Sequence, residues 1–363
     1  MDRKDYDEKV KELLGDVSTY KVLKKVPTKK TERDMNGILL KMKREETIGE
    51  NLYKRLHSSD GLPPRFYGLL KVHKNGCPLR PIVSFISTPT YNLSKYVAKI
   101  LKPLTGNSDY TVKNSTKFCE GITNIKLQDD DILSFNVVSL STSIPVDVAI
   151  SVAHNRLINN ENLQDRTAIP ITDIIKLLDF CLSTTNFQYD HKHYKQIHGT
   201  AMGSPISAIM ANMVMEDLEE RALASLTNPP LFWKRFVDDV ITTAKSGSTQ
   251  TFLEHLNSVK PCITFTIERE NESKIAFLDT MVHHQEDGKL ITTVYRKPTH
   301  TDHYLSYLSH HPSIQASCGQ IINGSGRENS LNKIRPQQGK TKNNVYITIK
   351  WIPQTLYLEC QQT

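Results

Sequence analysis

Two adjacent aspartates, Asp238 and Asp239, interrupt an apolar stretch that reads FVDDVIT. Apolar residues on both sides are typical of buried strands, so the pattern predicts a hairpin with the acids at its tip. Two carboxylates held together in a poorly solvated place repel each other unless a cation lies between them. Mg²⁺, which prefers oxygen ligands, is the natural cation for this pair. Taken alone, the pair is also compatible with an ordinary Asp-rich turn.

Composition excludes several classes of protein. The chain has 363 residues, of which 38% are hydrophobic and 23% charged, which is typical of a globular protein with a sizeable core. No apolar run approaches the roughly 18–20 residues of a membrane span, and the charged N-terminus does not resemble a signal peptide. The six cysteines form no CxxC pair, which argues against a disulfide scaffold or a thiolate zinc site. We therefore expect no membrane partner and an intracellular location, nuclear or cytoplasmic.

Charge is distributed unevenly along the chain. The net charge of +7 is weak evidence for a polyanionic partner, but residues 65–104 contain seven Lys and Arg and no Asp or Glu. The segments FYGLLKV and LRPIVSFI flank HKNGCP, whose Asn-Gly pair predicts a hairpin turn. Lys71 and Arg80 then lie on either side of the turn and project two cations from one ribbon. The alternative is a solvated basic surface hairpin.

Periodicity predicts the remaining elements in outline. Residues 1–60 are expected to form two surface helices, separated by a break at VLKKVPTKKTER. A strand is expected at 131–145, and the glycine-bearing loop 196–205 is expected to open a long helix with a buried Met-rich stripe. Further helices are predicted at 146–158, 174–184, 206–226 and 251–259, and short strands at ITFTIE, AFLDTMVHH and LITTVYRKP.

The order of these features resembles the fingers and palm of a reverse transcriptase. A basic hairpin, the FNVVSLSTSIP strand, the GTAMGSP loop with its helix and the FVDD hairpin follow one another in that order. The phrases FYGLLKVHK, PLRPIVSFISTPTYNLSKYVAKIL, QIHGTAMGSPISAIMANMVMEDLE and VYRKPTHTDHYLSYLSHHP are similar to the polymerases of Penelope-like retroelements. The resemblance covers about residues 1–312. The PTHTD and FLDT phrases disfavour a maturase-like or telomerase-like polymerase.

The resemblance implies an α+β right-hand polymerase fold with a partial or missing thumb. It implies fingers at 1–125, a palm at 126–300, and a primer-grip end with an irregular C-terminal remnant at 301–363. The implied function is that of an RNA-directed DNA polymerase, a nucleotidyltransferase that uses an RNA template, a DNA primer and deoxynucleoside triphosphates. In this family, two Mg²⁺ ions held by carboxylates activate the primer hydroxyl and stabilise the leaving pyrophosphate.

The resemblance also assigns roles to residues. Asp238 and Asp239 match the metal-binding pair, and Asp238 is the expected direct ligand. Arg80 matches the arginine that clamps the triphosphate, with Lys71 as its companion. The residues matched to the nucleotide and template loop are Gln196, Gly203 and Ser204, and those matched to the primer grip are Tyr295, Arg296 and Lys297.

Two positions within the site depart from the family. Asn136 stands where the family has the motif A aspartate, and a neutral amide is a poor bridging ligand for two divalent ions. Asp131 lies five residues away, which on a strand is roughly 17 Å and the opposite face, so it is not expected to substitute. Ser141 replaces the Phe or Tyr that acts as a steric gate against ribonucleotides. We therefore expect impaired activity, and a catalytically inactive nucleic-acid-binding remnant of the same fold is the alternative.

The ends of the chain depart from the family as well. Met1 begins in the middle of a family phrase, the resemblance fails after about Pro312, and no GIY…YIG endonuclease pair is present. These features suggest a truncated, degenerate copy. The histidines at 300, 303, 310 and 311 lie in a family phrase, and we expect packing or nucleic-acid contact from them in preference to zinc binding.

Overall fold

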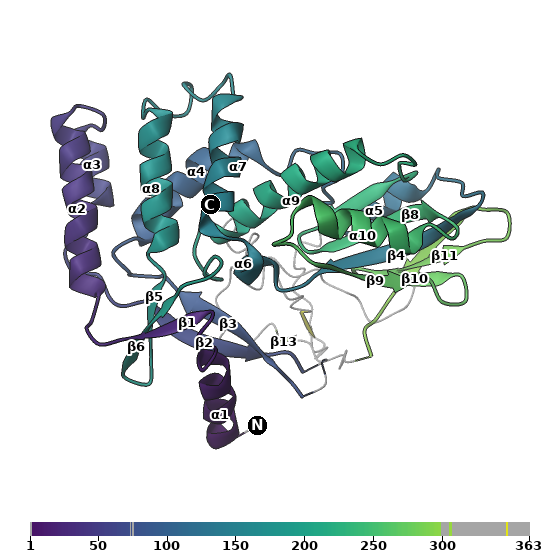
Figure 1. Cartoon of the computed structure of the whole chain (residues 1–363), viewed down its shortest axis with the longest axis horizontal. Coiled ribbons are helices and arrows are strands. Elements are labelled where there is room, and N and C mark those ends of the chain that lie inside the picture. The colour runs from purple at the N-terminus through teal and green to yellow at the C-terminus, as the bar shows by residue number, and fades with distance from the viewer. Residues whose placement is uncertain (1, 73, 75, 299–304, 307–345, 348–363) are drawn as a thin grey trace, which may run out of the picture. The chain divides into compact units, whose positions relative to one another are not determined.

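The computed structural model describes residues 2–72, 74, 76–298, 305–306 and 346–347. The chain divides into two units, and the first of them, residues 1–297, is built around three sheets (Figure 1). The second unit, 298–363, is described only by the antiparallel strands β13 (Leu305–Ser306) and β14 (Tyr346–Ile347) and by Pro298. Every predicted site residue lies in the first unit, whereas the four histidines between 300 and 311 lie outside the described residues. The predicted domain boundaries at 125 and 300 stay a prediction.

The helices of the first unit are α1 (Arg3–Leu14), α2 (Thr28–Arg44), α3 (Glu50–Leu56), α4 (Tyr91–Leu101), α5 (Ser115–Ile122), α6 (Leu140–Ser143), α7 (Val146–Ile158), α8 (Ile171–Ser183), α9 (Ser207–Ala224) and α10 (Thr249–Val259), with a 3₁₀ turn at Lys102–Leu104. The strands are β1 (Tyr20–Leu23), β2 (Arg65–Leu70), β3 (Leu79–Ser84), β4 (Asp130–Val137), β5 (Asn186–Tyr189), β6 (Lys192–Gln196), β7 (Trp233–Phe236), β8 (Asp239–Lys245), β9 (Phe265–Arg269), β10 (Lys274–Phe277), β11 (Thr280–His284) and β12 (Leu290–Val294). None of these helices is long and apolar enough to span a membrane, as far as the described residues extend.

The central sheet has the strand order β7-β8-β4-β9 and carries the FVDD hairpin. Its strand β4 is buried on both faces. Phe135 packs edge-on against Phe252 of α10, and Ile132 belongs to a second core with Phe118 and Phe277 on the opposite side. A strand buried on both faces is rich in apolar residues, and this burial holds the polar end of β4 in a fixed position.

A second sheet has the order β1-β6-β5-β2-β3 and contains the basic hairpin (Figure 1). One face is closed by aromatic packing, in which Phe66 stacks on Phe187 and Phe187 stacks on Tyr194. Helix α1 covers this face through Val10 and Leu14. The Lys9 ammonium of α1 also donates to the Gly76 carbonyl at 2.7 Å, which ties the helix to the turn of the basic hairpin.

The structure confirms the two hairpins and the helices α7, α8, α9 and α10, with shifts of a few residues at their ends. The predicted break between the first two helices is confirmed at Pro27, but it does not extend to residue 33, because α2 already begins at Thr28. Strand β4 ends at Val137, well before the predicted end, since Ser139 adopts a left-handed φ of 52° and α6 follows. The predicted strand AFLDTMVHH is divided into β10 and β11 by a turn at Leu278, where φ is 56°.

Candidate active site

The aspartate pair lies at the tip of the β7–β8 hairpin. Phe236 pairs with Asp239, so the connecting turn consists of Val237 and Asp238. Val237 has a φ of 59°, which is rare for a β-branched residue and marks a tightly constrained turn. Both aspartate side chains are partly exposed at this tip. The predicted position of the pair is therefore confirmed.

Asn136 lies directly beside the pair, as the motif order predicts. It is the register partner of Asp239 across the β4–β8 ladder, and its Nδ2 donates to Asp239 Oδ1 at 2.8 Å. The backbone amide of Val137 donates to the Asp238 carbonyl at 3.0 Å, which fixes the turn against the end of β4. The structure therefore brings all three positions together.

Asp129, Asp130 and Asp131 do not reach this site. Asp130 and Asp131 pair with Lys245 and Ala244 at the opposite end of the β4–β8 ladder. The buried Asp130 also accepts a hydrogen bond from the Lys245 ammonium at 3.0 Å. The expectation that Asp131 cannot replace an aspartate at position 136 is consistent with this geometry, and the same holds for Asp129 and Asp130.

The carboxylate pair carries uncompensated negative charge. Burial, and then the neighbouring Asp238, raise the pKa of Asp239 from 3.8 to about 6, and the charges of Lys297 and Lys74 only partly oppose this shift. A carboxylate pair with this excess of charge fits a hard divalent cation. Asn136, which donates a hydrogen bond to Asp239, carries no charge of its own. Within the described residues, no cluster of three His, Cys, Asp or Glu side chains could hold a metal ion, so the site offers two carboxylates.

The basic hairpin approaches the carboxylates. Arg80 of β3 is the register partner of Leu69, and Lys71 follows β2 directly. Burial lowers the pKa of Lys71, as do the nearby Arg80 and Lys74, while Asp238 acts in the opposite direction. Lys71 therefore lies within the electrostatic range of both Arg80 and an aspartate of the site. Lys74, in the turn, was not singled out in the sequence.

The loop at 197–205 packs between β3 and α6. Gly203 has a φ of 114°, and a Cβ there would lie 2.2 Å from the Val83 carbonyl oxygen, so this position requires glycine. Ser204 follows in a tight turn, with its amide donating to the Ala201 carbonyl. On the α6 side, the Ser141 carbonyl accepts from the amide of Thr200 at 2.7 Å.

Direct contact with a nucleotide requires an exposed side chain, and the side chain of Gln196 is not exposed. Its side chain is buried, and Nε2 donates to the His198 carbonyl at 2.8 Å. In this structure the Gln196 side chain therefore braces the loop from inside. A direct contact of this residue with a nucleotide stays a prediction.

The predicted primer-grip residues follow β12. The Tyr295 amide donates to the Asp279 carbonyl at 2.8 Å, which holds the chain next to the β10–β11 turn. Arg296 and Lys297 are exposed, and the charge of Lys297 lowers the pKa of Asp239. The structure thus brings Lys297 near the carboxylate pair.

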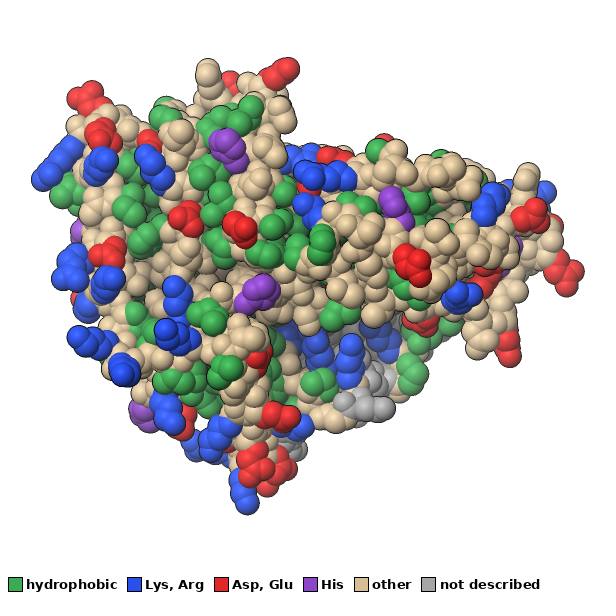
Figure 2. All heavy atoms as spheres, in the orientation of Figure 1, with side chains coloured by type: hydrophobic (Ala, Val, Ile, Leu, Met, Phe, Trp, Pro, Cys, Tyr) green, Lys and Arg blue, Asp and Glu red, His purple; other side chains and the backbone are tan. Residues whose placement is uncertain are grey.

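The second face of the β1-β6-β5-β2-β3 sheet carries four Lys and Arg side chains among other polar and apolar ones. Because Phe66, Phe187 and Tyr194 point to the core, strand alternation places their neighbours on the opposite face. The described residues of this face include no acid and comprise Lys21, Leu23, Arg65, Tyr67, Leu69, Arg80, Ile82, Ser84, Asn186, Gln188, His193 and Lys195. Figure 2 also shows Lys and Arg side chains in a hollow beside the β4–β9 region. Cations interleaved with an aromatic ring are typical of surfaces that bind single-stranded nucleic acids.

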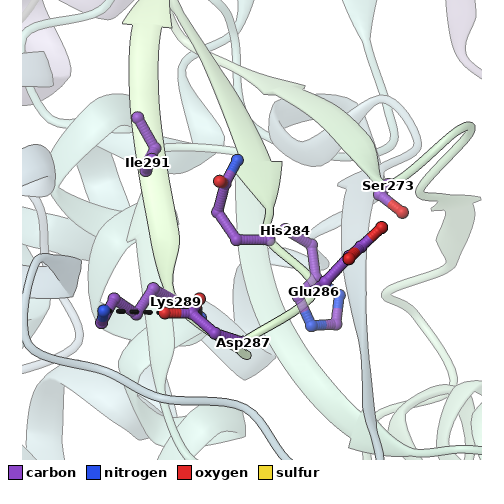
Figure 3. A pocket seen from close by; sticks show the side chains of 7 residues that line it. Ser273, His284, Glu286, Asp287, Lys289 and Ile291 are labelled. Carbon is purple, nitrogen blue, oxygen red and sulfur yellow. Dashed lines mark hydrogen bonds and ion pairs between the residues drawn. The ribbon is translucent and has the colours of Figure 1, made fainter.

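A separate pocket of about 660 Å³ opens at the β11–β12 hairpin (Figure 3). Its lining includes Ser273, Glu286 and the ion pair of Lys289 with Asp287, whose atoms lie 2.7 Å apart. His284 faces Glu270 at 3.5 Å. These charges largely pair with one another, and we assign the pocket no function.

The sequence matches no family model, and a search of the curated proteins found no match. Among solved structures, the chain is similar to the telomerase of Candida albicans in complex with the TWJ fragment of telomeric RNA, with a TM-score of 0.56 and 11% identity over 84% of this chain and 51% of that chain. A further match is C-terminally truncated apo telomerase of Candida tropicalis, with a TM-score of 0.48 and 14% identity over 65% of this chain and 56% of that chain. Another is the BmCPV RNA-dependent RNA polymerase at its elongation state, with a TM-score of 0.48 and 14% identity over 82% of this chain and 29% of that chain.

The first of these similarities shows the fold: the chain is a mixed helix-and-sheet protein with a polymerase fold like that of telomerase, a reverse transcriptase. The α+β polymerase fold predicted from the sequence is thereby confirmed. The chain spans about half the length of the telomerase chains that it matches.

Proposed function

We propose that the chain is the reverse transcriptase domain of a Penelope-like retroelement, an RNA-directed DNA polymerase impaired at its metal site. The observation that carries this proposal is the convergence of Asp238 and Asp239 with position 136, next to basic residues of the hairpin. The family phrases quoted above point to the Penelope-like elements. An RNA template, a DNA primer and deoxynucleoside triphosphates are the proposed partners.

In this proposal, Asp238 and Asp239 hold Mg²⁺, which supplies Lewis-acid activation of the primer hydroxyl and offsets charge on the leaving pyrophosphate. Arg80 and Lys71 bind the triphosphate, since a planar guanidinium suits bidentate phosphate contact. The backbone of the turn at Gly203 contacts the nucleotide. The basic face of the second sheet receives the single-stranded template, and Lys297 lies toward the primer.

Asn136 weakens this site in two ways. Its amide lacks the negative charge of a carboxylate, and its Nδ2 occupies Asp239 Oδ1, an oxygen that would otherwise be available to a cation. A metal ligand contributes several kcal/mol of transition-state stabilisation, so its loss costs roughly 10²–10⁴ in rate. Ser141 in place of an aromatic gate leaves room for a ribose 2′-hydroxyl.

The second candidate function is nucleic-acid binding without catalysis, which the Asn136–Asp239 hydrogen bond favours. The basic face of the second sheet lies on different strands from the carboxylates, so binding of a single strand does not require the metal site.

Primer extension distinguishes the two functions. The parent and Asp238→Asn would be incubated with an RNA template, a DNA primer, deoxynucleotides and Mg²⁺, and binding of the same primer–template would be measured by fluorescence anisotropy. Low extension by the parent that disappears in Asp238→Asn supports the polymerase. Binding without any extension supports the second function, and the absence of both would contradict the two proposals together.

A further inference from the structure

A fully buried arginine lies two residues before the aspartate turn. Arg235 of β7 is 0% exposed. Burial of a charge is costly unless hydrogen bonds and an opposite charge compensate it, so this residue needs a physical explanation. Its neighbours Trp233 and Phe232 belong to the hydrophobic cores, and no sequence pattern indicates an inward-facing charge at this position.

The guanidinium connects the turn to helix α9. Nε donates to Glu219 Oε1 at 2.7 Å, and Nη1 donates to Asn212 Oδ1 at 3.0 Å. The same Nη1 donates to the Val237 carbonyl at 3.2 Å. Both Asn212 and Glu219 belong to α9, so one side chain joins the turn to the helix that precedes β7 in the chain.

The carbonyl that Arg235 contacts belongs to the strained residue of the turn. A β-branched residue at a positive φ persists only where its surroundings hold it, and Val237 is such a residue. Asp238 and Asp239 follow it directly. Helix α9 begins just after the Gly203 loop, so Arg235 links the aspartate turn to the helix that follows this loop.

Stability alone explains this arrangement poorly. Glu219 Oε2 and Arg235 Nη2 have no hydrogen-bond partner among the described residues, although Nη2 lies 4.0 Å from Glu216 Oε1. Burial raises the pKa of Glu219 in spite of the adjacent guanidinium. Replacing an imperfectly satisfied buried ion pair with neutral groups is often neutral or stabilising.

We propose that Arg235, held by Glu219 and Asn212, is a positioning residue that fixes the Val237–Asp238 turn and so orients the carboxylates toward a divalent cation. The part of this inference that concerns cation binding rests on the proposed function, in which Asp238 and Asp239 hold a divalent cation. The positioning itself is a property of the turn and is measurable without a metal.

The test uses Arg235→Met/Glu219→Gln, which removes the charges of Arg235 and Glu219. The glutamine keeps an acceptor for the Trp233 indole, which donates to Glu219 at 2.7 Å. The control is Lys260→Met/Asp217→Asn, which removes the 2.7 Å ion pair between Asp217 of α9 and Lys260 at the end of α10, a pair that does not contact the turn. Hydrogen exchange of a peptide covering residues 236–240 would be measured in the full chain, together with the thermal midpoint. Binding of Mn²⁺ would be followed by its electron paramagnetic resonance signal.

We expect exchange in the turn to accelerate at least about 10-fold in the double variant while α10 stays protected, and the Mn²⁺ affinity to fall about 10-fold. The control should change neither property. A folded double variant with parental exchange in the turn would overturn the inference. If the double variant does not fold, Arg235→Lys decides, since its shorter ammonium cannot reach Glu219 and Val237 together, and parental exchange in it would overturn the inference as well. If the parent binds no Mn²⁺, the cation site fails, and exchange still decides the role of Arg235.

Discussion

The substitution Asp239→Asn should stabilise the protein in the absence of divalent cations. Burial and the charge of Asp238 raise the pKa of Asp239 from 3.8 to about 6, so the folded chain holds this carboxylate in an unfavourable state at neutral pH. Each pKa unit corresponds to about 1.4 kcal/mol, which gives about 3 kcal/mol as an upper limit. The side chain is partly exposed and solvent screens it, so we expect about 1–2 kcal/mol. An asparagine keeps an oxygen that accepts from Asn136.

The pH dependence has a definite sign. Below pH 3.8 Asp239 is protonated in both the folded and the unfolded chain, so the variant gains nothing there. Between 3.8 and about 6 the folded chain holds more protons than the unfolded chain, so the stability of the parent falls as the pH rises. Above about 6 the penalty is complete, and the gain of the variant is greatest.

Urea unfolding at pH 4.5 and pH 8 in EDTA measures this difference. The control Asp131→Asn changes a carboxylate on β4 outside the turn. The reasoning would be refuted if Asp239→Asn were less stable than the parent at pH 8, or if its gain were the same at both pH values.

Three further substitutions test the surroundings of the site. Gly203→Ala should destabilise the fold by more than about 2 kcal/mol, since its Cβ would lie 2.2 Å from the Val83 carbonyl oxygen, and urea unfolding measures this loss. Arg80→Ala should weaken nucleotide binding more than single-strand binding, because a bidentate phosphate contact is lost, as calorimetry and anisotropy would show. Tyr6→Phe should cost about 1 kcal/mol and accelerate hydrogen exchange in β2, because the Gly68 amide loses an acceptor at 2.6 Å.

Each of these expectations has an outcome that contradicts it. A Gly203→Ala protein of parental stability would show that the loop does not pack against β3 as described. An equal loss of nucleotide and single-strand binding in Arg80→Ala would make this residue part of a general basic surface. Parental exchange of β2 in Tyr6→Phe would show that α1 does not brace the hairpin through this contact.

The parts of the fold that the sequence predicted depend on local patterns. The FVDD hairpin, the basic hairpin and α9 are each specified by residues close together in the chain, by alternation, by turn residues or by helical spacing. Strand β1 was missed because the residues of its partner β6 lie 170 to 176 positions away, and four residues that include a lysine give no clear alternation. The β5–β6 hairpin was missed because its turn uses Asp190 and His191 at positive φ, with no glycine to mark it.

The site was predicted in part for the same reason. Motif order places Asn136, Asp238 and Asp239 together, and the ladder between β4 and β8 has this register. Two features were out of reach of the sequence. Gln196 is polar and is the last residue of the polar strand β6, yet its side chain is buried by the loop it supports. Arg235 is buried because the preceding helix α9 packs against β7 and supplies Glu219 and Asn212, a tertiary contact that no local pattern marks.

The substitution Asn136→Asp tests the central claim most directly, because it supplies the carboxylate that the proposed metal site lacks. Primer extension on an RNA template would be compared for the parent, Asn136→Asp and Asn136→Asp/Asp238→Asn, with deoxynucleotides and ribonucleotides in parallel. A recovered metal ligand should raise the rate by roughly 10²-fold or more, without restoring a processive enzyme. The restored protein should also accept ribonucleotides, since Ser141 leaves the sugar pocket open, and the double variant should be inactive. Robust extension by the unmodified protein would contradict the claim that Asn136 disables the site.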